Sequence, residues 1–358
     1  MNRKEQELFF ALCSFKKADK QKIRGMLKEY GTPEVLGQLF CNRMQAVAYG
    51  VMKDSGALNL VDREFRNALA AAYVQNVNKN KSFFHSIDLL TDILREHKNK
   101  YAMLKGALLC KLYPDGYRTS NDIDLLVRPG DITEIGEALT AAGFRQGYIR
   151  NGVFEEADRS KIIESRITRG ETVPYILAVD LPFMPFLEVD INFSQDYKNG
   201  DGLLLESMLS HVQTVNIQGV KLETLNKYDF FIHLCFHLYK EATTLPWVKM
   251  GRDMTFYKFC DIYMLMFAFL PIEIDKLFRR AKELGAEVIC SCVMLWTDAL
   301  FQTATPQIQE YAKKNLEGRE LILHEVIDPT SGRRLIYAER DIRRRFFAGN
   351  RMKLLKEV

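Results

Sequence analysis

Residues 104–127 read LKGALLCKLYPDGYRTSNDIDLLV, and this segment carries most of the information about fold and chemistry. Its last part, DIDLLV at 122–127, predicts a buried β-strand, because a compact apolar run that follows turn residues is typical of one. Side chains alternate along a strand, so Asp122 and Asp124 share one face. Two carboxylates on one face repel each other, and burial disfavours their charge further. A divalent cation such as Mg²⁺ removes both costs, so the pair predicts a metal site, with a solvent-facing strand edge as the alternative.

Two features next to the acidic pair are candidates for binding phosphate. Lys105-Gly106 lies where a short apolar run ends and a helical pattern begins, which predicts a strand-to-helix turn. Glycine lets the backbone approach a phosphate closely, free N–H groups at a helix start bind anions, and the lysine adds a positive charge. Arg118 lies in the loop before Asp122, where it is a candidate partner for phosphate or for the carboxylates. An ordinary turn and a solvated loop arginine are the plain alternatives.

A second acidic strand is predicted downstream, at FLEVDINF, residues 186–193. By alternation, Glu188 and Asp190 share one face of it. A third carboxylate from a neighbouring strand would complete a site for two metal ions, which in phosphoryl transfer stabilises the attacking and the leaving oxygens. Asp190 is the preferred ligand because apolar residues flank it, and Glu188 is kept as the other candidate. Either acid is also a candidate general base for an acceptor hydroxyl.

The spacing of apolar residues divides the chain into three regions. Residues 1–98 show helical spacing throughout, 99–200 mix helical and strand patterns, and 201–358 are mainly helical again. The expected fold class is therefore α+β, with a mixed sheet between helical N- and C-terminal regions.

Single elements are also predicted within these regions. Four stretches of the α+β region are β-prone: FRQGYI, KIIESRITR, TVPYILAV and FLEVDINF. A helix is expected at 131–143, which ends in a glycine. Farther along, VQTVNIQGVKLET predicts a hairpin around Gln218-Gly219, and residues 227–242 and 256–270 predict strongly apolar helices.

The composition points to an ordinary globular protein. The chain has 358 residues, of which 47% are hydrophobic and 27% charged, so it can bury a large core. Its seven cysteines are scattered and odd in number, which fits a reduced cytoplasmic setting better than a disulfide framework. No apolar run approaches the roughly 20 residues that cross a bilayer, and the first residues do not form a signal peptide. The net charge of +4 is too small to indicate a nucleic-acid partner.

Two other groups of residues have both a chemical and a plain interpretation. His233 and His237 share a helix face, but zinc needs a third ligand that the sequence does not place, so a core or supporting role is favoured. A basic C-terminal segment is a candidate surface for a nucleic-acid acceptor such as tRNA, although a solvated face of an amphipathic helix is favoured. Its residues are Arg333, Arg334, Arg340, Arg343, Arg344, Arg345, Arg351, Lys353 and Lys356.

The order of the motifs resembles a known superfamily. LKGALL, YP, Arg118, DIDLLV and a helix that ends in Gly143-Phe144 follow one another closely. This order resembles the polymerase-β-type nucleotidyltransferases and, more narrowly, a bacterial family of uncharacterised nucleotidyltransferases. The resemblance extends from about residue 100 to 270, through the second acidic strand, the two histidines and Asp261-Ile262.

The resemblance implies a mixed sheet with two catalytic aspartates on one strand and a third acid on an adjacent one. It implies transfer of a nucleoside monophosphate from an NTP to an acceptor hydroxyl, with release of pyrophosphate. The acceptor stays open between a small molecule, a protein side chain and an RNA end. The implied site consists of Asp122, Asp124 and Asp190 or Glu188 around Mg²⁺ or Mn²⁺, Lys105 and Gly106 at the triphosphate, and Arg118 offsetting phosphate charge.

Two rival functions remain at this point. A D-x-D motif also holds the metal and nucleotide of some glycosyltransferases, although the helical segment before this motif argues against that class. A non-catalytic binding module that keeps the fold is the other rival. It gains weight because this chain has Gly106-Ala107 where the wider superfamily usually has Gly-Ser.

Overall fold

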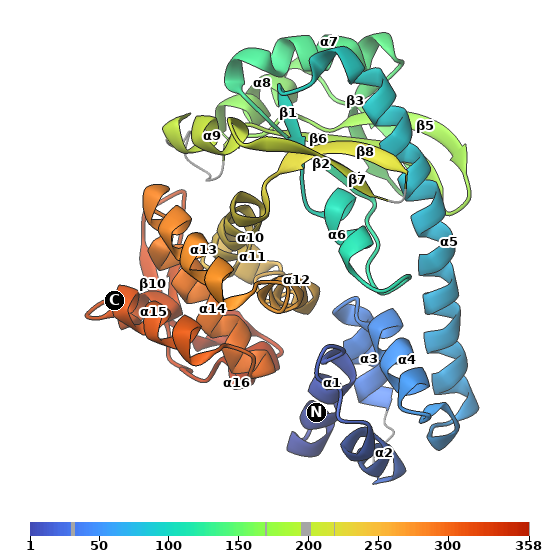
Figure 1. The fold of residues 1–358 in the computed structure, drawn as a ribbon, viewed down its shortest axis with the longest axis vertical. Coiled ribbons are helices and arrows are strands. Elements are labelled where there is room, and N and C mark those ends of the chain that lie inside the picture. Colours follow the sequence, from blue (N-terminus) through green and yellow to red (C-terminus); the bar gives the residue numbers. More distant parts are fainter. Residues whose placement is uncertain (30–32, 169, 195–201, 218, 358) are drawn as a thin grey trace. The chain divides into compact units, whose positions relative to one another are not determined.

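The computed structural model describes residues 1–29, 33–168, 170–194, 202–217 and 219–357. It confirms the α+β class, with a large mixed sheet and helical regions toward both ends of the chain (Figure 1). The chain forms two compact units: one contains Met1–Tyr73 and Phe231–Val358, and the other contains Val74–Phe230. The first unit is thus built from two separate segments, whereas the three regions expected from the sequence are continuous. None of the described helices is both long enough and apolar enough to cross a membrane.

The unit Val74–Phe230 is built on an eight-stranded sheet with the order β4-β3-β5-β6-β2-β1-β8-β7. Strand β2 lies inside the sheet, where it pairs parallel to β6 and antiparallel to β1. The strands are β1 (Tyr101–Met103), β2 (Asp122–Val127), β3 (Arg145–Arg150), β4 (Val153–Glu156), β5 (Tyr175–Leu181), β6 (Met184–Asn192), β7 (Val212–Ile217) and β8 (Val220–Leu225).

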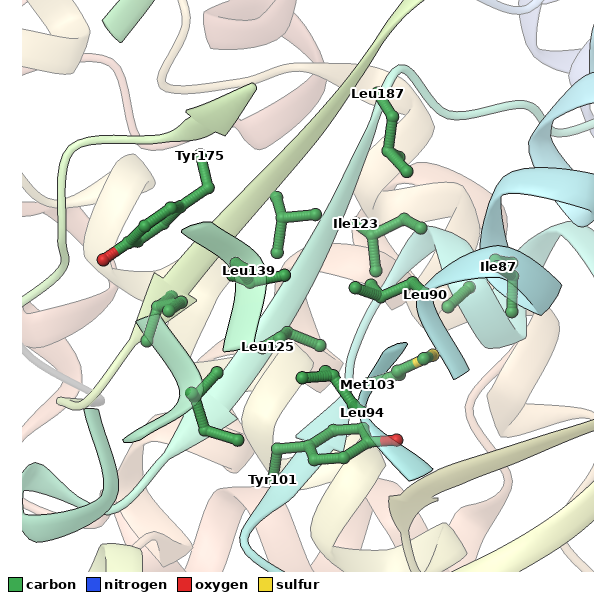
Figure 2. Close-up of a cluster of buried hydrophobic side chains, with 14 of the residues drawn as sticks. Ile87, Leu90, Leu94, Tyr101, Met103, Ile123, Leu125, Leu139, Tyr175 and Leu187 are labelled. Atoms are coloured by element: carbon green, nitrogen blue, oxygen red, sulfur yellow. The ribbon is translucent and has the colours of Figure 1, made fainter. Parts of the chain in front are cut away.

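Helices cover one face of this sheet and bury its apolar side chains. The helices of the unit are the part of α5 (Arg63–Ile93) from Val74 on, α6 (Gly106–Leu112), α7 (Ile132–Ala141), α8 (Arg159–Thr168) and α9 (Gly202–Leu209). Leu90 of α5 and Leu139 of α7 belong to one buried cluster with Ile123 and Leu125 of β2 and Val189 of β6. Figure 2 shows the side chains of α5 and α7 lying against those of β2. Because side chains alternate, the acidic residues of β2 and β6 are directed away from this core.

Most of the predicted elements of this unit are confirmed, and one is wrong. FRQGYI, TVPYILAV and FLEVDINF form β3, β5 and β6, and the expected hairpin is β7–β8, although Gln218 lies outside the described residues. KIIESRITR, whose last residue also lies outside them, belongs to helix α8 instead of a strand. The carboxylate of Asp158 accepts a hydrogen bond of 2.9 Å from the backbone N–H of Lys161 and so starts the helix. This cap outweighs the β preference of the isoleucines.

The other unit is mainly helical and carries a small antiparallel sheet with the order β11-β10-β9. The helix predicted at 227–242 is confirmed as α10, and the one predicted at 256–270 ends earlier, at Met266. The helices and strands of this unit are α1 (Arg3–Cys13), α2 (Lys20–Glu29), α3 (Pro33–Cys41), α4 (Gln45–Asp54), α5 up to Tyr73, most of α10 (Lys227–Ala242), α11 (Leu245–Lys249), α12 (Phe256–Met266), α13 (Pro271–Glu283), α14 (Glu287–Phe301), α15 (Pro306–Leu316), β9 (Glu325–Ile327), β10 (Arg334–Tyr337), α16 (Ile342–Phe346) and β11 (Leu355–Glu357).

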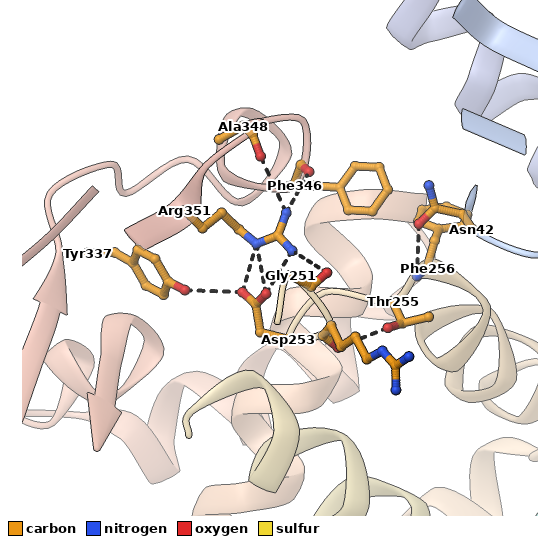
Figure 3. A network of polar contacts seen from close by, with 10 residues as sticks. Asn42, Gly251, Asp253, Thr255, Phe256, Tyr337, Phe346, Ala348 and Arg351 are labelled. Atoms are coloured by element: carbon orange, nitrogen blue, oxygen red, sulfur yellow. Dashed lines mark hydrogen bonds and ion pairs between the residues drawn. The ribbon is translucent and has the colours of Figure 1, made fainter. Parts of the chain in front are cut away.

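The basic C-terminal segment does not form the amphipathic helix that the sequence suggested. It passes through β10, the short helix α16 and β11, so its cations do not form one helical stripe. Several of them serve the fold. Arg351 makes three charged hydrogen bonds of 2.9, 2.8 and 2.7 Å to the buried carboxylate of Asp253, which also accepts one of 3.1 Å from Tyr337 (Figure 3). Arg343 donates to the backbone carbonyls of Ala299 and Leu300.

Candidate active site

Four carboxylates stand in register on two neighbouring strands. In the parallel pair β2–β6, Asp122 lies opposite Glu188, and Asp124 lies opposite Asp190. Neighbouring strands are about 4.8 Å apart, so the four side chains leave the sheet next to one another on the face that points away from the helical core. Both candidates for the third acid are therefore adjacent to the first pair.

The electrostatics of this group are unfavourable without a cation. Asp124 is buried, with 6% of its surface exposed, and the other three acids are partly exposed. Burial raises the pKa of Asp190 well above its usual range, and the charges of Asp124, Asp122 and Glu188 raise it further. Burial and the same kind of repulsion raise the pKa of Glu188. Carboxylates that share a face and resist ionisation together are typical of sites built for a positive charge.

One positive charge is already present, and it comes from the strand-to-helix turn. As predicted, Lys105-Gly106 lies at the turn from β1 into α6, where Lys105 precedes the helix and Gly106 is its first residue. The ammonium of Lys105 lies 2.6 Å from a carboxylate oxygen of Asp124. Burial by itself lowers the pKa of Lys105, but Asp124, Asp122 and Asp190 more than offset this, so the pKa lies above its ordinary value. The sequence suggested phosphate as the partner of this lysine, whereas the structure pairs it with an acid of the site.

Ser120 and Asn192 also belong to the site, although the sequence did not single them out. The hydroxyl of Ser120 donates a 2.8 Å hydrogen bond to Asp122. The amide of Asn192 donates a long, 3.5 Å bond to Asp124. Alternation could have indicated both residues. Ser120 lies two residues before Asp122, and Asn192 lies two residues after Asp190, so each is expected on the same face as that acid. Both contacts help to orient the carboxylates of β2.

Gly106 is held close to this serine. A Cβ atom on Gly106 would lie 2.5 Å from both Cβ and Oγ of Ser120, closer than real Cβ contacts come. The glycine is thus required by the packing of the turn against the loop before β2, a reason that the sequence did not reveal. The residue before it, Lys105, has φ +42°, in a region that non-glycine residues seldom adopt.

Gly106→Ala is accordingly expected to destabilise the protein by about 1–3 kcal/mol, because the added methyl group has no room. Adding Ser120→Gly should recover part of the loss, since it removes both atoms that the methyl group meets. Gly130→Ala is the matched control, because nothing lies within 4 Å of its Cβ position. Urea denaturation of the variants measures the differences. A loss as small as that of Gly130→Ala would contradict the packing described.

Asp190→Asn should raise the melting temperature of the protein in EDTA. The pKa of Asp190 is higher in the folded protein than its ordinary value of about 4, so ionising this group disfavours folding. The cost is absent below the ordinary pKa and grows as the pH rises toward the folded value. The gain in melting temperature should therefore be larger at pH 7.5 than at pH 5. A variant that melts below the wild type at both pH values would show that repulsion between Asp190 and the neighbouring acids does not destabilise the folded protein.

Arg118 lies in the loop before β2, as the sequence indicated. Its backbone carbonyl accepts a 2.9 Å hydrogen bond from Asn80, and its guanidinium donates to the carbonyl of Thr119. The histidines predicted on one helix face lie on α10, where Nε2 of His237 is 3.5 Å from the buried carboxylate of Glu241. They do not belong to a metal-ligand cluster within the described part of the chain.

The acids fit a hard divalent cation by their chemistry. Carboxylate oxygens are the ligands that Mg²⁺ and Mn²⁺ prefer, and the buried, mutually repelling charges supply the driving force. Among the residues that the structure describes, no three acidic, histidine or cysteine side chains already converge as ligands. An ion would therefore require the side chains of β2 and β6 to rotate toward it, and it would compete with Lys105 for the charge of Asp124.

The mixed sheet with acids in register on β2 and β6 has the arrangement that the sequence resemblance implied for a nucleotidyltransferase core. The chain belongs to the family of uncharacterised nucleotidyltransferases, whose model matches residues 32–302. Among solved structures it is similar to an antigenic nucleotidyltransferase-like protein from Paracoccidioides brasiliensis, at 14% identity and a TM-score of 0.33, over 56% of this chain and 88% of that one. No curated protein matches the sequence.

Proposed function

We propose that this protein is a metal-dependent nucleotidyltransferase that moves a nucleoside monophosphate from an NTP to an acceptor hydroxyl and releases pyrophosphate. The register of β2 with β6 carries the proposal, since it brings Asp122 and Asp124 next to Glu188 and Asp190. The family supports a nucleotide as one substrate. The acceptor is a small molecule, a protein side chain or an RNA end.

The four acids have different proposed roles, metal binding or proton acceptance, according to their place on β2 and β6. Asp122, Asp124 and Asp190 would hold Mg²⁺ or Mn²⁺, which when bound stabilises charge on the attacking and leaving oxygens. Glu188 stands opposite Asp122 and is partly exposed, so it is the candidate to accept the proton of the acceptor hydroxyl. Its raised pKa favours that role.

Positive charge for the phosphates would come from the two segments that lead into the site. Lys105 and Arg118 are the candidate cations for a triphosphate, one at the turn before α6 and the other in the loop before β2. Gly106 keeps that turn close to the loop through its contact with Ser120. Ser120 would hold the carboxylate of Asp122 in the orientation that the ion requires.

A non-catalytic binding module is the second candidate function. It is favoured by the ion pair of Lys105 with Asp124, because this pair gives the buried acid a partner without any metal. A protein of this kind would bind its partner equally well after Asp122→Asn and Asp124→Asn. A glycosyltransferase keeps less support, because the family is one of nucleotidyltransferases.

Labelling separates these functions. Each of the four α-³²P-NTPs is incubated with the protein, Mg²⁺ or Mn²⁺ and total cell extract, and labelled nucleotide sugars form a parallel arm. The proposal predicts label on one molecular class in an NTP arm, and none when Asp122 and Asp124 are both changed to asparagine. Label from a nucleotide sugar alone would indicate a glycosyltransferase. No transfer in any arm would favour the binding module.

A further inference from the structure

The ammonium of Lys105 lies beside Asp124, one of the acids proposed to hold the metal ion. It lies 2.6 Å from Oδ1 of Asp124, and the two side chains are only 20% and 7% exposed. This buried ion pair is part of the folded chain itself. A free metal ion that takes Oδ1 of Asp124 must separate this pair, and one that takes the other oxygen places a second positive charge beside the ammonium.

The backbone around Lys105 leaves its side chain as the part that can move. Lys105 is the residue that caps α6, with φ +42° and ψ −111°. Gly106 is in close contact with Ser120, and Ser120 is hydrogen-bonded to Asp122. The turn is thus tied to the acidic strand. The ammonium can leave Asp124 by rotation of the flexible lysine stem, without a change in the fold.

Where the ammonium goes determines the energy of the exchange. If a free Mg²⁺ or Mn²⁺ takes its place, the ammonium loses its hydrogen-bonded acid and lies close to a second positive charge, which is unfavourable. If the ion arrives together with a triphosphate, the phosphate oxygens offer the ammonium a new anionic partner. The same exchange then keeps every charge paired.

We infer that Lys105 makes the site take up its divalent cation as a metal–triphosphate complex and resist the free ion. This inference rests on the proposed function, because it requires the acids of β2 and β6 to bind metal. Metal and triphosphate are then positively coupled, and the coupling must be reciprocal: each ligand strengthens the binding of the other by the same factor. Lys105 is the residue that carries this coupling, and the substrate that enters the site is the metal complex of the nucleotide.

Two binding measurements with the full chain test the inference. Electron paramagnetic resonance measures the affinity for Mn²⁺ alone, and calorimetry measures the affinity for preformed Mn²⁺ complexes of the four α,β-methylene nucleoside triphosphates. Lys105→Met should bind Mn²⁺ alone about tenfold more tightly than the wild type, and the best Mn²⁺–nucleotide complex about tenfold more weakly. These opposite changes are the signature, because general damage to the site would weaken both.

Matched variants make the result specific. Lys105→Arg keeps the charge and should bind free Mn²⁺ as weakly as the wild type. This result would also show that the position tolerates substitution. Lys100→Met removes one positive charge from the same unit, where Lys100 pairs with Glu134, and should change neither affinity. Unchanged or weaker binding of Mn²⁺ alone by Lys105→Met, or equal effects of Lys100→Met, would overturn the inference.

The outcomes also distinguish this inference from the proposed function. Opposite changes in the two affinities, together with no transfer of label from any NTP, would leave the coupling in place and refute the catalysis. Transfer of label, together with identical metal affinities of the wild type and Lys105→Met, would support the catalysis and refute the coupling.

Discussion

Asp124→Asn is expected to lower the rate of nucleotidyl transfer by about 10³-fold or more. A metal ion contributes several kcal/mol of transition-state stabilisation, and each 1.36 kcal/mol corresponds to about a factor of ten. Asp124 is the most buried of the four acids and lies opposite Asp190, so an amide at this position removes charge from the centre of the group. The loss should appear in kcat, measured as label transferred per unit time at saturating NTP.

The control for this variant is an acid of the same sheet that lies outside the group. Asp180 is exposed on β5, and Asp180→Asn should transfer label at the wild-type rate. Circular dichroism and the melting temperature of both variants show whether the fold is kept. A folded Asp124→Asn protein that retains a rate within a factor of ten of the wild type would exclude this residue as a metal ligand.

Asp253→Asn is expected to lower the free energy of unfolding of its unit by about 3–5 kcal/mol. The substitution leaves the guanidinium of Arg351 buried without a counter-charge, and uncompensated buried charges cost about that much. A second buried arginine, Arg345, increases the effect. Burial lowers the pKa of Arg345 to about 10 and the charge of Asp253 opposes this shift, so Asp253 also stabilises the charged form of Arg345. Figure 3 shows how the carboxylate joins Tyr337 to Arg351.

Urea denaturation measures this loss, followed by a probe in the same unit, such as the fluorescence of Trp296. Arg351→Met together with Asp253→Asn should be less destabilising than the sum of the single changes, because the pair is removed as a whole. Glu64→Gln is the comparison, since Glu64 forms an exposed ion pair with Arg63, and such pairs contribute little. Additive losses in the double variant would show that the buried ion pair does not determine the effect.

Residue alternation made the acidic strands predictable. DIDLLV and FLEVDINF each place two acids on one face and apolar residues on the other, so the sequence alone indicated two strands with polar and apolar sides. The structure adds that β2 and β6 are direct neighbours and that their acids match in register. Pairing depends on contacts between segments that are far apart in the chain, and a pattern within one strand contains no information about its neighbour.

The partners of Lys105 and Gly106 could not be predicted for the same reason. Both residues lie at the predicted turn, but their contacts with Asp124 and Ser120 cross from one segment to another. The incorrect strand at KIIESRITR has a local cause. Its isoleucines favour a strand by propensity, but the carboxylate of Asp158 just before the stretch caps a helix instead.

Crystals grown with Mn²⁺ and a non-hydrolysable NTP test the central claim most directly, through the anomalous scattering of manganese. The account predicts a peak about 2.1 Å from carboxylate oxygens of Asp122 and Asp124, with Asp190 or Glu188 as a further ligand and a phosphate oxygen on the same ion. A manganese peak away from these strands, or bound nucleotide without any ion beside Asp122 and Asp124, would contradict it.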